Sequence, residues 1–302
     1  MQISKISNMI HDEKLFDGSA GSTSVIDGKT RVAVILAYPA KHVRTPHFFN
    51  ARCRERGINM VLVPWEVPPE GLAATMAAFR PVSNLAGMIV TVPHKIMAAA
   101  ACDELVGDAR PLQVANAIRR EPTGRLVGAT LDGDGFVAGL RKRDISVDGK
   151  RVLMVGAGGA ASSIGLALLG AGAAMLTIAN RDKAKGARLA ESLAAACPQA
   201  IVQAGSAATA GFDIIINATT LGLRPDDPLP VDVASADAHA VVAEVVMQPA
   251  VTPLLEQARA RGLRIHEGEH MLLAQVDALI DHLVGPGSIS TRREHPPSLP
   301  SA

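Results

Sequence analysis

Residues 151–181 hold the feature that most constrains the fold, a glycine-rich turn between a strand and a helix. An apolar run at 152–155 has the length of a strand, and the turn GAGG at 156–159 follows it directly. Small residues at 160–169 predict a helix, and the apolar run 174–179 predicts a second strand. A glycine turn in this setting is typical of a dinucleotide-binding fingerprint.

The residues of this turn have separate physical roles. Gly156 permits a tight turn, and Gly158 lets the backbone approach a pyrophosphate. Ala161, at the third fingerprint position, is small enough for the helix to contact the strand. The helix N-terminus presents unpaired N–H groups and a partial positive charge to phosphate. We expect the dinucleotide to contact the residues of the turn and the helix start: Gly156, Ala157, Gly158, Gly159 and Ala160.

The end of the second strand decides which dinucleotide is favoured. Enzymes that use NAD usually carry an acidic residue about twenty residues after the glycines, where it accepts from the ribose 2′-hydroxyl. Here Asn180 and Arg181 occupy that place, with Lys185 close behind. Guanidinium and ammonium groups suit a 2′-phosphate, which favours NADP with contacts to these three residues. Asp182 would repel that phosphate, so NAD remains an alternative.

Composition excludes several other classes. A chain of 302 residues predicts two domains, and its net charge of +1 argues against a nucleic-acid partner. The cysteines are odd in number and far apart, at 53, 102 and 197, which fits a reducing cytosol better than a disulfide framework. No uninterrupted apolar stretch has membrane-span length, and residues 1–30 are too polar for a signal peptide. We therefore expect a cytoplasmic protein without a membrane partner, either a monomer or a homodimer.

Alternating strands and helices predict an α/β fold with two domains. The first is a mostly parallel sheet whose strands begin near residues 31, 59 and 85, followed by a hairpin of 114–119 with 125–130. The second is a Rossmann-type sheet built on the fingerprint, with later strands at 213–218, 241–246 and 264–266. Helices are expected at 183–196 and, between the last two strands, at 249–262. Trp65 and Met97 are expected in the core.

Five segments follow from this pattern. They are an N-terminal extension 1–30, a substrate-binding catalytic domain 31–130, an NADP-binding domain 131–267, a helix 268–285 that returns to the first domain, and a tail 286–302. The tail is rich in proline and serine, so we expect it to be disordered.

Two charged residues at strand ends are candidates for proton transfer. Oxidation of an alcohol by hydride transfer needs a group that takes the hydroxyl proton. Lys95 lies in VTVPHK where a strand ends, and Asp132 lies in LDGDGF at the domain junction. A water-poor cleft lowers the pKa of a lysine from about 10.4, and an aspartate would hold it in place. Considered singly, either could be an ordinary surface charge.

The order of short motifs resembles that of the shikimate/quinate dehydrogenase family from about residue 29 to residue 284. The chain carries AYPAKHVRTPHFFN, IVTVPHK, QVAN, ATLDGDG, GAGGAA, NR, NATTLG and GEHMLLAQ in that order. The family pattern has GxPIxHSxSPxxHN, NVTxPxK, GAVN, DNTDGxG, GAGGAA, NR, NATxxG and GxGMLxxQ. Several motifs in one order are far more specific than any one of them.

The resemblance implies roles for individual residues. Lys95 matches the catalytic lysine that moves the hydroxyl proton, and Asp132 matches its paired aspartate. Thr45 matches a residue that holds the substrate carboxylate. Residues that match those hydrogen-bonding the ring hydroxyls are Thr91, Asn116 and Gln275. Residues that match the stretch near the nicotinamide are Asn217, Thr219 and Gly222.

Three departures from the family pattern concern the substrate. Val43 stands where the family has the first serine of SxS, Ile89 replaces the asparagine of NVT, and residues 129–131 read ATL instead of DNT. An unpaired substrate hydroxyl or carboxylate costs on the order of 1–3 kcal/mol. The pattern therefore suggests the same chemistry on an altered substrate, such as quinate, an amino-substituted analogue or another hydroxylated ring acid.

The resulting hypothesis is a reversible NADP-dependent hydride transfer between a ring hydroxyl of shikimate, or of a related cyclic hydroxy acid, and its 3-dehydro ketone. One alternative is a quinate or aminoshikimate dehydrogenase that uses NAD. Another is a dinucleotide-binding sensor without turnover, although such a sensor has no need of Lys95. His266 and His270 are four residues apart, but Gly268 between them argues against helical continuity, and we expect no metal.

Overall fold

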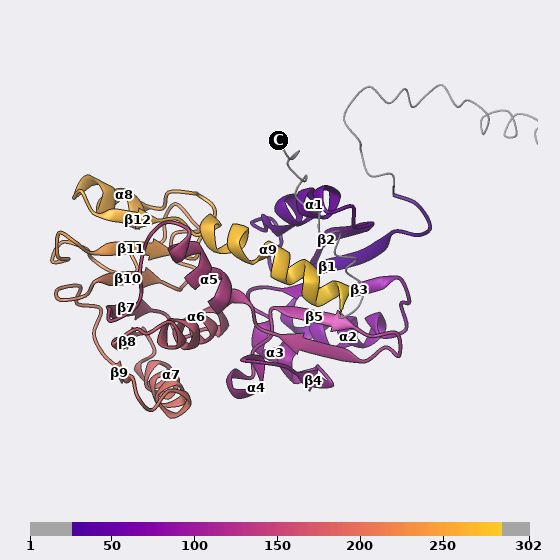
Figure 1. The fold of residues 1–302 in the computed structure, drawn as a ribbon, viewed down its shortest axis with the longest axis horizontal. Coiled ribbons are helices and arrows are strands. Elements are labelled where there is room, and N and C mark those ends of the chain that lie inside the picture. The colour runs from indigo at the N-terminus through magenta and orange to yellow at the C-terminus, as the bar shows by residue number, and fades with distance from the viewer. Residues whose placement is uncertain (1–25, 286–302) are drawn as a thin grey trace, which may run out of the picture.

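The structure, a computed structural model, describes residues 26–285 and contains two six-stranded sheets with helices on both faces (Figure 1). Most of the predicted extension 1–30 and all of the predicted tail 286–302 lie outside the described residues. The predicted fold class, α/β with two domains, is confirmed.

The first sheet has the order β2-β1-β3-β5-β6-β4. Its strands are β1 (Arg31–Ala37), β2 (Met60–Glu66), β3 (Leu85–Val90), β4 (Glu104–Leu105), β5 (Ala117–Arg120) and β6 (Leu126–Ala129). Strand β1 runs parallel to β2 and β3, whereas β5 runs antiparallel to β3 and β6, as the predicted hairpin requires. The associated helices are α1 (Thr45–Glu55), α2 (Leu72–Phe79), α3 (Lys95–Ala100) and α4 (Ala109–Leu112), with a short 3-10 helix at Pro69–Gly71.

The second sheet is parallel throughout, in the order β12-β11-β10-β7-β8-β9. Its strands are β7 (Arg151–Val155), β8 (Met175–Ala179), β9 (Ile201–Ala204), β10 (Ile214–Asn217), β11 (Val241–Glu244) and β12 (Arg264–His266). The helices of this half are α5 (Asp132–Arg141), α6 (Gly159–Gly170), α7 (Lys183–Ala196) and α8 (Pro253–Ala260). The strand order reverses between β7 and β10, which is where open α/β sheets bind dinucleotides.

Helix α9 (Glu269–Val284) joins the two halves. It packs on α5 of the second half and on α1, β3 and β5 of the first, and Figure 1 shows it in yellow running from one half to the other. Its apolar face contributes Val276, Leu279 and Leu283 to the core beneath α1. Asp277 accepts from Arg52 of α1 at 2.8 Å on the rim of this contact.

Three local predictions differ from the structure. Strand β9 was not predicted, because it lies at the sheet edge and its side chains are mostly exposed. Helix α8 begins at Pro253 instead of Pro249, since Thr252 accepts from the Leu255 N–H and caps it. Trp65 and Met97 are 45% and 46% exposed, so their placement in the core was wrong. Within residues 26–285, no helix is long and apolar enough to cross a membrane.

Candidate active site

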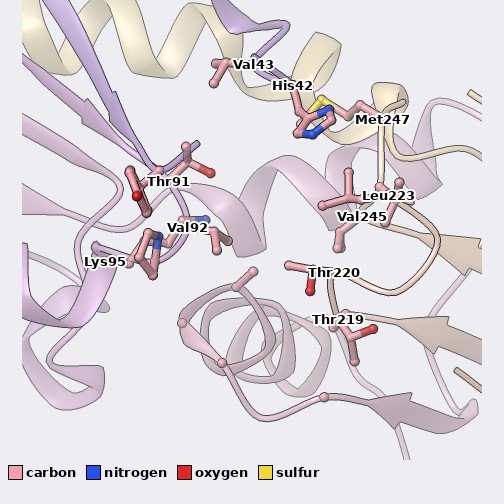
Figure 2. Close-up of a pocket in the computed structure, with 18 of the residues that line it drawn as sticks. His42, Val43, Thr91, Val92, Lys95, Thr219, Thr220, Leu223, Val245 and Met247 are labelled. Carbon is pink, nitrogen blue, oxygen red and sulfur yellow. The ribbon is translucent and has the colours of Figure 1, made fainter. Parts of the chain in front are cut away.

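A cleft of about 670 Å³ opens between the two halves, at the C-terminal ends of their parallel strands. One wall comes from the first half, through the loop after β1 and the loop between β3 and α3. The other comes from the glycine turn and from the loops after β8, β10 and β11. In Figure 2, Val43, Thr91 and Lys95 lie on one side, opposite Thr219, Thr220, Leu223 and Val245.

The glycine turn has the geometry that the fingerprint predicts. Gly156 has φ +123°, and a β-carbon there would lie 2.9 Å from the Ala218 carbonyl oxygen. Gly158 precedes α6 in an extended conformation, with open space around its α-carbon and no side-chain cap on the helix. The first N–H groups of α6 are therefore free to bind an anion at the cleft. Ala161 is fully buried against the sheet.

At the end of β8, Asp182 is used by the protein itself. Its carboxylate accepts from the Lys185 N–H at 3.0 Å and caps α7, while Asn180 donates to the Asp182 carbonyl at 2.8 Å. Arg181 is exposed on the cleft wall, and in the part of the chain that the structure describes it forms no ion pair. The residues present therefore fit a 2′-phosphate, because the one carboxylate at this position is committed to the helix cap.

Lys95 and Asp132 meet behind the cleft wall. The ammonium of Lys95, in the first turn of α3, donates to Oδ2 of Asp132, in the first turn of α5. Asn116 donates to the other carboxylate oxygen at 2.8 Å and accepts from the Leu131 N–H at 2.8 Å. Lys95 is 9% exposed and Asp132 is 2% exposed, so water competes little with this ion pair. Lys95 lines the cleft. Asp132 lies behind it and bonds its ammonium, and Asn116 bonds Asp132 in turn.

The remaining predicted substrate residues surround this pair. Thr45 lines the cleft at the start of α1, and Thr91 lines it directly after β3. Gln275 lies on α9 against Gly135, one turn of α5 beyond Asp132. Its Oε1 is buried, and no hydrogen-bond partner for it lies within residues 26–285. A buried, unsatisfied amide oxygen is unfavourable, so this atom is a candidate acceptor for a ligand hydroxyl.

The positions that depart from the family pattern have different fates. Val43 lines the cleft, where the family pattern has a serine. Ile89 is 4% exposed and packs in the core between the first sheet and α9. Thr130 donates to Ser163 of α6 at 3.0 Å, and the same Ser163 oxygen accepts from the Gly133 N–H at 2.9 Å. Thr130 thus serves the junction between the halves.

One buried acid was not identified from the sequence. Glu244 ends β11 and is fully buried; it accepts from Asn217 at 2.8 Å and from Thr252 at 2.8 Å. Burial raises its pKa to about 7, against hydrogen bonds from Thr252, Asn217 and the Val246 N–H that lower it. The signal in the sequence was a single acidic residue inside the apolar run VVAEVV, at the end of a strand.

His266 and His270 interact with each other. Their Nδ1 atoms are 3.3 Å apart, and Nε2 of His270 is 2.7 Å from a guanidinium nitrogen of Arg143. Because Arg143 can only donate, His270 carries its proton on Nδ1 and donates it to His266. Across residues 26–285, no group of three or more His, Cys, Asp or Glu side chains has an arrangement that could hold a metal.

A Rossmann-type sheet, a second α/β half and a Lys–Asp pair facing the glycine turn define a two-domain NAD(P)-dependent dehydrogenase. Residues 35–118 match the model of the shikimate dehydrogenase substrate binding domain, and residues 139–222 match that of shikimate / quinate 5-dehydrogenase. A shikimate dehydrogenase (NADP(+)) from Rhodospirillum rubrum is 39% identical over 83% of this chain and 90% of its own length.

Two solved structures extend the likeness to the whole fold. A shikimate dehydrogenase in complex with NADP+ superposes with a TM-score of 0.81 at 29% identity, covering 87% of this chain and 93% of the other. A 5-ketofructose reductase from Gluconobacter sp. strain CHM43 gives 0.75 at 30% identity, covering 85% and 94%. The chain belongs to the shikimate dehydrogenase family, whose members are NAD(P)-dependent oxidoreductases acting on a CH–OH group. The predicted family and enzyme class are thus confirmed, and the predicted NADP agrees with the curated relatives.

Proposed function

We propose that this enzyme oxidises a ring hydroxyl of shikimate, or of a closely related cyclic hydroxy acid, reversibly to the 3-dehydro ketone with NADP. The observation that carries the proposal is the buried Lys95–Asp132 pair, whose lysine lies beside the glycine turn at the cleft. A shikimate dehydrogenase is also what the curated relative from Rhodospirillum rubrum is named. A binding protein without turnover would have no use for a buried proton-transfer pair.

Each half of the protein would bind one of the two reactants. Residues 31–130, together with the returning helix 268–285, hold the substrate, and residues 131–267 hold the cofactor. NADP, when bound, supplies a nicotinamide that accepts or returns the hydride. Gly156 to Ala160 would hold its pyrophosphate at the start of α6, and Arg181 with Lys185 and Asn180 would hold its 2′-phosphate. Residues proposed for the nicotinamide side of the cleft are Asn217, Thr219 and Gly222.

The proton is handled by the Lys95–Asp132 pair. For oxidation the Lys95 ammonium would first release a proton to solvent; the O–H bond of the substrate then breaks and its proton passes to the lysine amine, while the carbon loses its hydride and the C=O bond forms. During reduction the Lys95 ammonium returns the proton to the oxygen that has gained the electron pair. Asp132 orients the lysine and stabilises its charged form, and Asn116 fixes the orientation of Asp132.

The other polar residues would orient the ring. Thr91, which lines the cleft, and Asn116 and Gln275, whose Oε1 has no partner within residues 26–285, would hydrogen-bond the ring hydroxyls. Thr45 is placed to donate to the carboxylate, and Val43 beside it adds no second donor. The enzyme would therefore carry out the same hydride transfer at the ring hydroxyl while it holds the substrate carboxylate weakly.

The proposal is tested by following formation of reduced nicotinamide with NADP+ and a panel of shikimate, quinate and an aminoshikimate, each repeated with NAD+. We expect turnover of at least one of these acids and a higher kcat/KM with NADP+ than with NAD+. A protein that binds NADP+ but turns over none of them would contradict the proposal and support the sensor alternative. Preference for NAD+ would contradict the assignment of Arg181.

A further inference from the structure

Glu244 occupies a place that the proton-transfer chemistry does not explain. It lies at the C-terminal end of β11. Strand β11 pairs with β10, and the strand order reverses between β10 and β7. Its side chain is fully buried, and both carboxylate oxygens accept hydrogen bonds from side chains. A carboxylate in such a position is usually avoided, because burying a charge is unfavourable unless it is paired with an opposite charge.

Its first partner, Asn217, ties it to the loop after β10. Asn217 is also fully buried; its Oδ1 accepts from the N–H and hydroxyl of Thr219, at 3.0 and 2.6 Å. The amide of Asn217 donates to the Leu221 carbonyl at 3.0 Å as well as to Glu244. Both donors and both acceptor positions of the Asn217 amide are therefore used. Because its oxygen accepts from Thr219, its NH2 group must face the Glu244 carboxylate.

Its second partner, Thr252, ties it to the loop after β11. The Thr252 hydroxyl donates to Glu244 at 2.8 Å and accepts from the Leu255 N–H as the cap of α8. Residues 245–248, between Glu244 and Thr252, line the cleft, as do Thr219 and Thr220 of the other loop. Glu244 is thus a single buried group that joins the two loops forming the cleft wall across from Lys95, the wall seen in Figure 2.

Within residues 26–285, no cation is hydrogen-bonded to Glu244. The hydrogen bonds to it within the described chain come from neutral groups, namely Asn217, Thr252 and the Val246 N–H. The ionisable side chains on the packed helix α8 and strand β12 are Glu256, Arg259, Arg264 and His266. The first three are exposed, and the His266 ring packs on Phe136 and His270 instead. None of these groups neutralises the charge of Glu244, whose chain neighbours Val245 and Val246 line the cleft.

The order of groups along the proposed cofactor places the nicotinamide against this wall. Arg181 marks the 2′-phosphate, and the start of α6 marks the pyrophosphate. The nicotinamide, on the far side of the pyrophosphate, must reach Lys95, since hydride and proton leave the same hydroxyl-bearing carbon. A bound nicotinamide would therefore lie between Lys95 and the two loops that Glu244 joins. The nicotinamide ring is cationic when oxidised and neutral when reduced.

We propose that Glu244 is a positioning residue that holds the nicotinamide side of the cleft and, through its buried charge, favours the oxidised cofactor over the reduced one. This inference rests on the proposed function, because it takes NADP to be the ligand. The ionised carboxylate attracts the cationic ring, and the protonated carboxyl does not. At the effective dielectric of a protein site this attraction favours NADP+ by a factor on the order of ten. The reciprocal effect is that bound NADP+ keeps the Glu244 carboxyl ionised to lower pH.

The direction of the pH dependence follows from the coupling between NADP+ binding and loss of the Glu244 proton. The Glu244 pKa of about 7 means that the free protein carries a substantial fraction of protonated Glu244 just below neutral pH. NADP+ binding expels that proton, and a tenfold preference gives release of about half a proton per site near pH 6.5. NADPH binding expels none from Glu244. The affinity for NADP+ relative to NADPH should thus rise with pH through this range.

Calorimetric titration in buffers of different ionisation enthalpy measures this proton release without any turnover. NADP+ and NADPH carry the same 2′-phosphate, so its own protonation cancels from the difference between them. We expect NADP+ to release about half a proton more than NADPH at pH 6.5 in the wild type. In Glu244→Gln the difference should vanish, and the ratio of the two dissociation constants should no longer change with pH. Glu256→Gln, at an exposed acid on α8, is the matched control and should behave as the wild type.

A second variant separates charge from position. Glu244→Asp keeps the charge but shortens the reach to Asn217 and Thr252, so both cofactors should bind more weakly while the extra proton release with NADP+ persists. A wild type without the extra release, or a Glu244→Gln protein that retains it, overturns the inference. Binding of neither cofactor to the wild type would instead contradict the proposed function.

Discussion

Gly159 of the cofactor turn and Lys95 of the opposite half are in direct contact: a β-carbon at Gly159 would lie 3.1 Å from the β-carbon of Lys95. The helix N-terminus that would hold phosphate and the lysine that would move the proton are therefore adjacent. Since Gly159 begins α6 and Lys95 begins α3, two helix starts converge on one point of the cleft. This contact explains why the turn needs a glycine at a helical position with no unusual φ angle.

The first prediction concerns Lys95. Lys95→Ala should lower turnover by roughly a hundredfold or more, because loss of a general acid/base removes the group that takes the hydroxyl proton. Affinity for NADP+, measured by titration, should stay near that of the wild type. Lys142→Ala, at an exposed lysine after α5, is the control. Turnover by Lys95→Ala at the wild-type rate would show that another group moves the proton.

The second prediction concerns cofactor choice. Arg181→Ala should weaken NADP binding much more than NAD binding, because only NADP brings the 2′-phosphate that the guanidinium can pair with. Asp182 should not compensate, since its carboxylate caps α7. Dissociation constants for both cofactors check this, with Arg188→Ala on the exposed side of α7 as the control. Equal losses for NADP and NAD would rule out the assigned role of Arg181.

The third prediction concerns the carboxylate of the substrate. Thr45 can donate to it, but Val43 cannot. A hydrogen bond to a charged group contributes about 1.5–3 kcal/mol. The wild type should therefore bind shikimate roughly ten- to a hundredfold more weakly than a variant that carries a second donor at residue 43.

Val43→Ser should therefore lower the KM for shikimate with kcat little changed, provided the restored bond is made equally in ground and transition states. Steady-state kinetics measure both constants, and Val63→Ser at an exposed valine outside the cleft is the control. If the wild type already binds shikimate tightly and Val43→Ser gains nothing, other groups hold the carboxylate.

The fourth prediction concerns acid stability. Burial, followed by the charges of His270 and Arg143, lowers the pKa of His266 to about 3. The unfolded chain gains a proton at this histidine below its ordinary pKa of about 6.5, whereas the native protein does not. The free energy of unfolding should thus fall as the pH falls from about 6.5 towards 3, by at most about 1.4 kcal/mol per pH unit from this residue.

Denaturant titrations of the wild type and His266→Gln over that pH range measure the contribution. The variant should lose less stability per pH unit than the wild type, and His47→Gln at an exposed histidine should match the wild type. The same pH slope in all three proteins would mean that His266 is not buried as a neutral ring.

Much of the second half could be predicted because its signals are local. The strand, glycine turn and helix at residues 151–170 are contiguous, and α7 was predicted with the observed bounds, Lys183–Ala196. The Asp182 cap is also a local signal, an aspartate directly before a helix, and reading it so would have removed the apparent conflict with NADP.

The rest depends on contacts between distant segments. Lys95 and Asp132 meet only because α3 and α5 begin at the same cleft, so their pairing needed the family pattern. Ile89 occupies a position that the family motif assigns to substrate binding, yet its side chain packs in the core. The periodicity of the sequence does not distinguish a core position from a cleft position here. Glu244 was missed because its importance comes from Asn217 and Thr252, which belong to other loops. Trp65 is exposed because β2 is an edge strand, which the strand pattern alone does not reveal.

The central claim is that this cleft passes a hydride between NADP and a hydroxyl-bearing carbon beside Lys95. The most direct measurement uses shikimate deuterated at the carbon whose hydroxyl is oxidised, with NADP+, and follows the label by mass spectrometry. The account predicts that the wild type transfers deuterium to the cofactor and forms the ketone in equal amount, while Lys95→Ala does so at roughly a hundredth of the rate or less. Recovery of unlabelled cofactor and unchanged acid from the wild type, despite bound NADP+, with deuterated shikimate and with quinate and an aminoshikimate deuterated at the corresponding carbon, would contradict it.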